Sequence, residues 1–589
     1  MRAEVEMGVG GEAGVGGETG AGGETGVSGE TGAGGEAGRR ARWAQDGLAA
    51  LAGIAAGVVT VGVGSLVALV TGASTNPVVA VGATFVDATP AWLKEFATST
   101  FGTRDKLVLA IGEAVVLALL AAAAGVLAAR RWAWGATLVV LLAAVSGVAA
   151  MSRPDAGTLA AAPSVIAGVA GLVTLRLLLD RLPPVRERVA APRVTAPQVT
   201  APQVTASRVT APRDEAALAE AAPAPSTGSV ARPGGPDRRG FLQATAAALG
   251  LGVVAILAGR VVGASARAVQ AARAALHLPA PATTAPAIPA GVQVDVPGME
   301  PWKTPADDFY RIDTALVVPQ LDPSTWELRV HGLVEQEITL TWAELLASDL
   351  VEAWVTLACV SNPVGGDLVG NQRWLGLPIR DVLARARPHA DADMVLSRSS
   401  DGFTASTPIE VLTDDRDALL AIGMDGEPLP IEHGFPVRMV VPGLYGYVSA
   451  TKWVVDLEIT RFADVTSYWT DRGWAPHGPV KTQSRISVPR DGAPLEVGEV
   501  VVAGTSWAQH RGITRVQVRV DGEPWQDADL ADDGGIDSWR QWSWRWQADA
   551  GRHTLYVRAY DPEGVQSGKR VDVVPNGAEG YDQVQVTVG

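Results

Sequence analysis

The single cysteine of this chain, Cys359, lies in the stretch Thr356–Trp374, TLACVSNPVGGDLVGNQRW. The glycines, the Asn and the Pro that follow it suit a tight loop better than a helix. A buried free cysteine is the ordinary role of such a residue, because the thiol packs like a small apolar group. Two chemical roles are also open: a nucleophile paired with His433, or a soft thiolate ligand for a metal that a cofactor carries.

A second group of chemical residues lies in the segment His433–Trp453, HGFPVRMVVPGLYGYVSATKW. His433, Arg438 and Lys452 lie on or beside two apolar strands, and the loop between these strands is rich in Gly and small residues. Cationic side chains beside backbone that a ligand can approach closely form an anion site, and phosphate is a natural guest. Three independent surface charges are the alternative that spacing alone leaves open.

Composition excludes several kinds of site. The net charge of −15 over 589 residues, with no dominant basic patch, argues against a general nucleic-acid binder. One cysteine excludes an intrachain disulfide, a multi-cysteine zinc site and a thiolate-held iron–sulfur cluster. No C-x-x-C-H motif for c-type haem attachment is present.

The cysteine and histidine segments together resemble the sulfite oxidase family of molybdopterin enzymes. TLACVSNPVGG is similar to the family's cysteine segment, roughly T-L-x-C-x-x-N. HGFPVRMVVPG followed by TKW is closer still to its H-G-F-P-V-R-x-V-V-P-G and K-W. LDPSTWELRVHGLV and TLTWAEL fit the pattern upstream, and the last part of the chain resembles the family's C-terminal dimerisation domain. The resemblance covers about residues 295–589.

The resemblance implies a role for each matching residue. Cys359 is the catalytic residue and metal ligand, whose thiolate binds molybdenum beside the dithiolene of the pterin. The implied cofactor-binding residues are Arg311, Asp313, Asn362, Asp401, His433, Arg438, Ser449, Thr451 and Lys452. Oxo-transfer chemistry belongs to such a cofactor, while the protein orients it and controls access.

Two departures from the family pattern concern the substrate. The animal and plant enzymes continue after the cysteine with G-N-R-R, whereas this chain has SNPV at 361–364. They also carry an active-site tyrosine in the segment matching 403–406, where this chain has Phe403. The expected function is two-electron oxo-transfer on a small molecule, either sulfite or another oxo-compound.

Two other functions remain open at this stage. A thiol hydrolase using Cys359 and His433 needs an orienting third residue and an oxyanion hole, and the sequence shows neither. A non-catalytic cell-surface protein with a β-sandwich interaction module and a degenerate cofactor site is the other alternative, which Phe403 keeps open.

The residues that carry chemistry lie in a β-rich globular region. Residues 290–470 alternate short strands with a few helical pieces, which indicates an α+β molybdopterin domain. Residues 484–589 contain regular alternating strands separated by turns, which predicts an antiparallel, Ig-like β-sandwich. Within it Trp539, Trp542, Trp544 and Trp546 are expected to be core and interface aromatics.

The N-terminal part has the composition of a membrane region. Residues 1–43 predict a disordered low-complexity tail. Residues 44–182 predict four transmembrane helices, in the apolar runs 47–72, 107–129, 133–152 and 163–180. Buried helices of a soluble bundle are the alternative. The whole chain is thus expected to be multidomain: a helical transmembrane region, an α+β domain and a β-sandwich.

A linker and a fifth span connect the two parts. Residues 183–236 form a Pro-rich linker that favours extended chain. Residues 237–264 predict a further transmembrane helix preceded by a twin-arginine-like signal, Arg238–Arg239. An ordinary Sec-inserted anchor with two chance arginines is the alternative.

Basic residues predict the orientation in the cell membrane. Arginines precede the first span, separate the second from the third and follow the fourth, while the loops 73–104 and 153–162 are less basic. The positive-inside rule therefore predicts a multi-pass protein with a cytoplasmic N-terminus and an extracytoplasmic catalytic domain.

The electron acceptor is expected to be a separate, unidentified protein or small molecule. None of the chain's seven histidines lies in the first four spans, so these spans cannot supply a His–His pair for a b-type haem, and no haem is expected. The other expected partners are a small-molecule substrate, membrane lipid and a second copy of the chain, which would form a homodimer through the C-terminal domain. No nucleic acid is expected.

Overall fold

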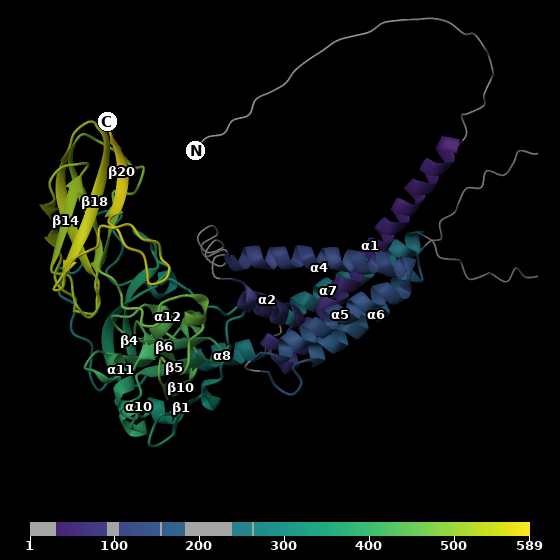
Figure 1. The fold of residues 1–589 in the computed structure, drawn as a ribbon, viewed down its shortest axis with the longest axis horizontal. Coiled ribbons are helices and arrows are strands. Elements are labelled where there is room, and N and C mark those ends of the chain that lie inside the picture. The colour runs from purple at the N-terminus through teal and green to yellow at the C-terminus, as the bar shows by residue number, and fades with distance from the viewer. Residues whose placement is uncertain (1–30, 91–92, 94–104, 154–155, 183–237, 262–263) are drawn as a thin grey trace, which may run out of the picture.

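The computed structural model describes all residues except 1–30, 91–92, 94–104, 154–155, 183–237 and 262–263. The described residues form a group of long helices, an α+β domain and a C-terminal β domain (Figure 1). The predicted linker 183–236 and the first thirty residues of the predicted tail lie outside the described residues.

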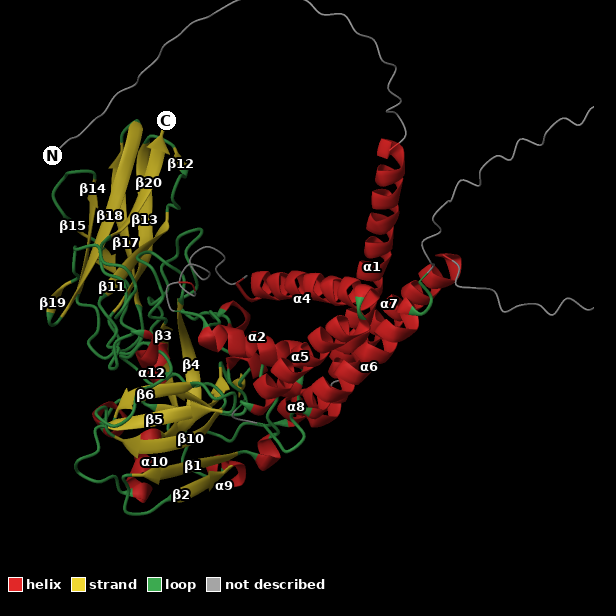
Figure 2. Cartoon of the chain, turned by 45° about the vertical axis from the view of Figure 1, so that its right-hand side comes forward, coloured by secondary structure: helices red, strands yellow, loops and turns green. Residues whose placement is uncertain are grey.

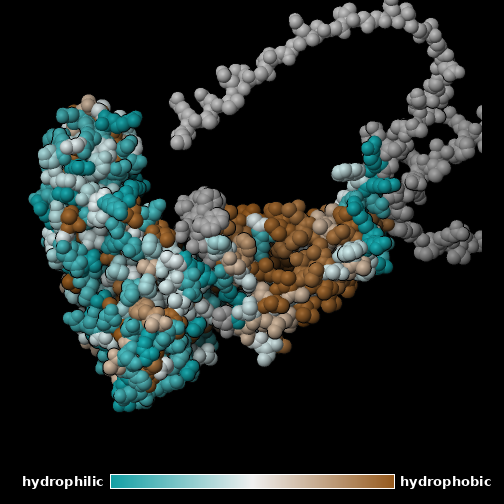
Figure 3. All heavy atoms as spheres, in the orientation of Figure 1, coloured by the Kyte–Doolittle hydropathy of each residue, from teal (hydrophilic) through white to brown (hydrophobic). Residues whose placement is uncertain are grey.

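Within the described residues, five helices are long and apolar enough to cross a membrane, by length and composition. They are α1 (Thr31–Thr71), α4 (Asp105–Arg130), α5 (Trp132–Met151), α6 (Ala162–Leu179) and α7 (Arg238–Val261). Their apolar surfaces form a broad hydrophobic region that contrasts with the polar β domains (Figure 3). Two glycines let α1 and α4 touch backbone to backbone, because a Cβ on Gly53 would lie 2.0 Å from the Ala121 carbonyl oxygen. A Cβ on Gly125 would lie equally close to the Ala49 carbonyl oxygen.

Two expectations for the N-terminal part differ from the structure. Helix α1 begins at Thr31, so the tail predicted over 1–43 is helical in its last part. The helix of the apolar run extends backward through Ala, Glu and Arg but also through four glycines, which are poor helix formers, so helix propensity does not predict this extension. The segment 73–104, expected as a loop, contains the 3-10 turn η1 (Ala73–Thr75) and α2 (Pro77–Ala88). The side chain of Asn76 caps α2, and Pro77 lies in its first turn. Both residues are ordinary signals of a helix start, but α2 is too short to be recognised as a membrane span.

The α+β domain contains two five-stranded sheets. One has the order β3–β4–β7–β8 with β9 also on β7, and the other has the order β2–β1–β10–β5–β6 (Figure 2). The strands of the first sheet are β3 (Val351–Ala358), β4 (Val369–Pro378), β7 (Leu419–Met424), β8 (Glu427–Pro428) and β9 (Arg438–Val440). The strands of the second are β1 (Glu327–Gly332), β2 (Ile338–Thr341), β5 (Met394–Ser399), β6 (Thr404–Pro408) and β10 (Val454–Thr460).

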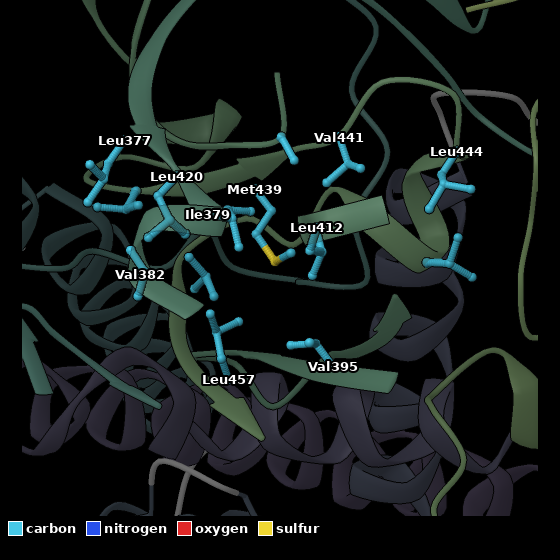
Figure 4. Close-up of a cluster of buried hydrophobic side chains, with 14 of the residues drawn as sticks. Leu377, Ile379, Val382, Val395, Leu412, Leu420, Met439, Val441, Leu444 and Leu457 are labelled. Atoms are coloured by element: carbon cyan, nitrogen blue, oxygen red, sulfur yellow. The ribbon is translucent and has the colours of Figure 1, made fainter. Parts of the chain in front are cut away.

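Short helices and a buried apolar cluster complete this domain. The helices are α8 (Ala264–Ala275), α9 (Trp342–Leu346), α10 (Ile379–Ala386), α11 (Glu410–Thr413) and α12 (Gly446–Ser449). Side chains of both sheets meet those of α10 and α11 in one cluster, which includes Ile379, Leu412, Leu420 and Leu457 (Figure 4). The α+β character predicted for 290–470 is thus observed.

The C-terminal domain contains two mainly antiparallel sheets around a shared core. Their orders are β11–β13–β17–β16 and β12–β20–β18–β14–β15, with β19 on β18. Trp542, Trp544 and Trp546 of β17 lie in the core between them, as predicted, and Trp539 is buried against the α+β domain. The strands are β11 (Gln483–Val488), β12 (Pro494–Leu495), β13 (Gly498–Trp507), β14 (Arg515–Val520), β15 (Gln526–Asp527), β16 (Asp529–Leu530), β17 (Arg540–Ala548), β18 (Gly551–Asp561), β19 (Gly564–Val565) and β20 (Asp582–Val588).

The helical part contacts the α+β domain at one end. Asp87, near the end of α2, accepts hydrogen bonds from Arg153 Nη1 at 2.9 Å and from the Tyr468 hydroxyl at 3.2 Å. Its carbonyl oxygen accepts one from Arg472 Nη2 at 2.9 Å. Arg153 also donates to the carbonyl oxygen of Asp401. The segments 73–104 and 153–162, which the charge pattern places outside the membrane, therefore both contribute residues that contact the α+β domain.

Candidate functional site

Cys359 lies directly after β3, at the start of the loop that joins β3 to β4. Its N–H donates to the Leu368 carbonyl oxygen at 2.9 Å, and its own carbonyl oxygen accepts from the Asn362 N–H at 3.1 Å. The thiol is buried, and burial raises its pKa, although hydrogen bonds from Ser361 partly oppose this. A thiol in this setting becomes a thiolate when a metal binds it.

The loop after the cysteine is held closed by its own residues and by the C-terminal domain. Asn362 Oδ1 accepts a hydrogen bond from the Leu368 N–H at 2.9 Å, so this side chain braces the loop. Gly365 has φ +77°, and a Cβ there would lie 2.2 Å from the Asp582 carboxylate. Arg485 donates to the Gly366 carbonyl oxygen at 2.9 Å.

The strand before the cysteine is also tied to the C-terminal domain, a contact that sequence reasoning did not find. The Thr356 N–H donates to the Asp537 carbonyl oxygen at 2.9 Å, and the Thr356 carbonyl oxygen accepts from Gln509 at 2.9 Å. The Trp539 N–H donates to the Thr356 hydroxyl at 2.8 Å. Both sides of the cysteine loop therefore depend on the C-terminal domain for their position.

Arg438 of β9 is a buried cation with no anionic partner among the described residues. Its guanidinium donates to the carbonyl oxygens of His433 and Met439 at 3.2 and 3.3 Å, and it stacks 5.1 Å from the Trp374 ring centre. Burial lowers its pKa to about 10. A buried charge is costly unless it is paired, so this arginine is suited to binding an anion that the protein chain does not supply.

His433 lies in the 3-10 turn η5 (Ile431–His433), where it is 5% exposed. Burial and the nearby charges of Arg438, Lys452 and Arg311 lower its pKa to about 3. The imidazole is therefore neutral at ordinary pH and acts as a hydrogen-bonding group. Its ring packs edge-on against Phe309, with ring centres 5.8 Å apart.

Lys452 and Arg311 share one buried carboxylate. Lys452 Nζ donates to Asp313 Oδ2 at 2.8 Å and to the Glu432 carbonyl oxygen at 3.1 Å, and Arg311 Nε donates to the same Asp313 oxygen at 2.9 Å. Burial lowers the pKa of Lys452 to about 8, against the raising effect of Asp313. The structure therefore brings Arg311, Asp313, His433, Arg438 and Lys452 together.

Gly434 is the point where the histidine turn, Arg438 and Lys452 come closest. Its φ is +113°, and a Cβ would lie 2.9 Å from Arg438 Cβ and 3.2 Å from Lys452 Cβ. Only glycine fits both this backbone conformation and this spacing.

Two tyrosines near the thiol were missed as site residues. Burial and, to a smaller extent, the Cys359 thiol raise the pKa of the Tyr310 hydroxyl, whereas Arg438 lowers it. Burial raises the pKa of Tyr445 to about 12, and this side chain is also coupled to Cys359. Tyr310 belongs to the FYRID segment, in which only Arg311 and Asp313 were predicted to be site residues. Phe403 instead packs against Tyr468, with ring centres 5.8 Å apart.

Three other predicted residues are engaged elsewhere. The Ser449 hydroxyl donates to the Tyr445 carbonyl oxygen at 3.0 Å, and the Thr451 hydroxyl bonds the Ser397 hydroxyl at 2.7 Å. Asp401 lies in the β5–β6 turn, where its carboxylate accepts from the Phe403 N–H at 3.3 Å. Cofactor contact by these three side chains stays a prediction.

The donor set fits a cofactor that brings its own metal. Among the described residues no group of three or more His, Cys, Asp and Glu side chains can hold a metal ion. A single soft thiol, together with a buried guanidinium that lacks an anionic partner among the described residues, fits a molybdenum–pterin group with a phosphate.

Comparisons with known proteins point the same way. The family model described as "Oxidoreductase molybdopterin binding domain" matches residues 315–469. Mitochondrial sulfite oxidase of Mus musculus is 32% identical over 280 residues, which are 40% of this chain and 50% of that protein. The uncharacterized oxidoreductase YuiH of Bacillus subtilis (strain 168) is 31% identical over 157 residues, which are 27% of this chain and 76% of that protein.

Among solved structures, the sulfane dehydrogenase SoxCD from Paracoccus pantotrophus aligns with a TM-score of 0.43 and 24% identity. The alignment covers 49% of this chain and 82% of that chain. The chain spans about half the length of the mitochondrial sulfite oxidases that it matches.

Proposed function

Because the chain belongs to the sulfite oxidase family of molybdopterin-dependent oxidoreductases, we propose that it performs two-electron oxo-transfer on a small substrate outside the cytoplasm, anchored in the membrane by its helices. The observation that carries the site assignment is the buried Arg438 guanidinium, which has no anionic partner among the described residues. Both Arg438 and the only thiol influence the pKa of the Tyr310 hydroxyl.

The residues divide into a metal side and an anion side. Cys359 would hold molybdenum as a thiolate, and the bound cofactor would supply the two-electron oxo chemistry. Arg438, Lys452 and Arg311 would neutralise the negative charge of the pterin and its phosphate. His433, neutral because of its low pKa, would donate or accept a hydrogen bond there.

The remaining predicted residues would act mainly through the backbone. Asn362 closes the cysteine loop, and Asp401 shapes a turn at the edge of the domain. Ser449 and Thr451 have their hydroxyls bonded within the protein, so their contribution would come from the backbone around Lys452.

Substrate choice would lie in the loop at 361–364 and in the tyrosines near the thiol. The SNPV segment follows Cys359 and Val360 and brings no cation, whereas Cys359 and Arg438 both influence the pKa of the Tyr310 hydroxyl. The site would accept a small oxo-compound, either sulfite or a related molecule, whose oxygen Tyr310 can hydrogen-bond.

Membrane anchoring is supported by helix length and by the interdomain contacts. The five apolar helices have the length needed to cross a bilayer. Asp87 and Arg153 lie in segments predicted to be outside the membrane, and both contact the α+β domain. We therefore propose that the N-terminus is cytoplasmic and the catalytic domain extracytoplasmic. Export of this domain would use either the twin-arginine or the Sec route.

The domain plan is part of the same proposal. Residues 44–182 and 237–264 would carry the spans, 290–470 the cofactor domain, and 484–589 an Ig-like domain that also forms a homodimer. Electrons would pass to a separate acceptor and not to a haem in this chain.

Metal and pterin analysis of the purified full chain tests the proposal. We expect about one molybdenum atom per chain and a pterin released on denaturation. X-ray absorption at the molybdenum edge should count one fewer sulfur neighbour in Cys359→Ser than in the parent. An unchanged sulfur count would remove Cys359 as the ligand, and absence of both metal and pterin would leave the surface-protein alternative.

A further inference from the structure

The electrons removed from a substrate must leave the chain, and one residue in the helices indicates where. Glu113 lies in α4, within the candidate span Leu107–Arg130, where the only other charged residue is the terminal Arg130. An ionisable group inside a span is costly and generally serves a function. Glu113 is eight residues from the helix start, about 12 Å along the axis.

The carboxylate of Glu113 is only partly satisfied. Its Oε1 atom is buried without a hydrogen-bond partner among the residues that the structure describes. Arg153, between α5 and α6, is paired with Asp87. Glu113 is therefore not the partner of a structural ion pair in the described part of the chain.

Glu113 and a residue of the catalytic domain both lie close to Gly82, a glycine of α2. The position that a Cβ would take on Gly82 lies 3.1 Å from Glu113 Oε2 and 3.2 Å from Leu316 Cδ1. Leu316 is three residues after Asp313, which binds Lys452 and Arg311 in the site described above. The carboxylate in the span and the segment that carries the site cations thus approach the same point of α2, the Cβ position of Gly82.

The surroundings of Glu113 are open to an apolar ligand from the lipid side. Phe85 lies one turn from Gly82 on α2 and is 56% exposed, and Val116 lies one turn from Glu113 on α4 and is 54% exposed. The main helix neighbour of α2 is α5, and α2 meets α4 where the Glu113 carboxylate packs against Gly82. An apolar lining with one carboxylate fits a lipid-soluble molecule that needs a proton.

We propose that Glu113 is the proton-transferring group of a binding site for a membrane quinone, between α2 and α4 and beside the catalytic domain. The inference deepens the proposed function, on which it rests, by identifying the class of electron acceptor. A b-type haem would need axial ligands that these helices lack, and a water-soluble acceptor would need no carboxylate within a span.

The reaction balances with a quinone as the oxidant. Oxidation of the substrate with an oxygen atom from water releases two electrons and two protons to the outer side. The quinone takes up two electrons and two protons, and each of its carbonyl oxygens becomes a hydroxyl. Glu113 gives one proton to the nearer oxygen and regains one from outer water, which also supplies the second. For a reductive reaction on the substrate, the same transfers run in reverse.

Photolabelling of the full chain tests the site without turnover. An azido-quinone should label peptides of α2 and α4 around Phe85 and Val116, and excess decylubiquinone should suppress the labelling at least about tenfold. Labelling confined to other helices, or labelling that decylubiquinone does not reduce, would overturn the proposal.

Acceptor-specific turnover tests the role of the carboxylate. Glu113→Gln should lower decylubiquinone-linked turnover roughly 100-fold, as for loss of a general acid, while ferricyanide-linked turnover and molybdenum content stay unchanged. Glu113→Asp should keep a larger fraction of the quinone-linked rate. Asp46→Asn is the matched control, because Asp46 forms an exposed ion pair with Arg130 at the other end of α4, and it should leave both rates unchanged.

The outcomes separate the two proposals. Equal loss with both acceptors in Glu113→Gln, or no loss with either, would remove the quinone role of Glu113. A chain without molybdenum and without ferricyanide-linked turnover would instead contradict the oxidoreductase proposal, while the photolabelling result would still decide whether a quinone site exists.

Discussion

The ammonium group of Lys452 donates a hydrogen bond to the carboxylate of Asp313 at 2.8 Å, and both side chains are less than a tenth exposed. This pair joins two segments 139 residues apart, the FYRID segment and the end of the HGFPVR segment. Arg311 binds the same carboxylate, so two cations share one negative charge. The surplus positive charge is available to an anionic cofactor.

The buried position of Lys452 predicts a pH-dependent stability of the cofactor-free protein. Its pKa in the folded protein, about 8, is below the unfolded value of 10.5. Between these values the unfolded chain holds a proton that the folded chain has released, so stability should rise as pH increases from about 8 to 10.5. Thermal unfolding midpoints of the parent, measured against Lys452→Met across this window, check the sign. A midpoint difference that does not change with pH would contradict it.

Replacing Arg438 should lower cofactor affinity without lowering the stability of the cofactor-free protein. Arg438→Met removes a buried charge that has no carboxylate partner, so the cofactor-free protein should be as stable as the parent or more stable by about 1 kcal/mol. Cofactor affinity should fall about 10- to 100-fold, because a hydrogen bond to a charged group is lost. Thermal unfolding of the cofactor-free protein and pterin content per chain measure the two effects. A strongly destabilised variant with normal pterin content would show that Arg438 is structural.

Gly434 predicts a local steric effect on the cation cluster. Gly434→Ala places a Cβ 2.9 Å from Arg438 Cβ on a backbone with φ +113°, so it should destabilise the protein by about 1–3 kcal/mol and lower the cofactor content. Gly473→Ala is the matched control, since Gly473 has φ +90° but no atom within 4 Å of its Cβ position. Only the Gly434 variant should lose cofactor. Equal cofactor loss in both would point to backbone strain in general.

The sequence alone was sufficient to predict which residues lie together where the pattern is periodic or a long motif is present. The alternation in SWRQWSWRWQA predicted that Trp542, Trp544 and Trp546 face one core, and they do. The HGFPVR segment predicted that His433, Arg438 and Lys452 lie together, because a histidine turn and two strands separated by a short loop cannot place them far apart.

What the sequence did not reveal depends on contacts between distant segments. Tyr310 lies near Cys359 although the two residues are 49 positions apart in the sequence. No periodic pattern in the sequence indicates that this tyrosine belongs to the site. The ties from Asp537 and Gln509 to Thr356 join domains, so a reading of single segments does not find them. The hydrogen bond between the hydroxyls of Thr451 and Ser397 likewise joins distant segments, and the role predicted for Thr451 in cofactor binding stays a prediction.

The burial of the only thiol makes the predicted membrane orientation directly measurable. Cys359 is 9% exposed, so the parent should react little with a charged, membrane-impermeant maleimide. Leu159, in the segment before α6 that is predicted to be outside, is 63% exposed, and Trp43, on the predicted cytoplasmic side, is 78% exposed. In right-side-out membrane vesicles, Leu159→Cys should react at once, and Trp43→Cys only after the membrane is permeabilised. The reverse pattern would place the α+β domain in the cytoplasm, because Arg153 joins the same end of the helices to Asp401 of that domain.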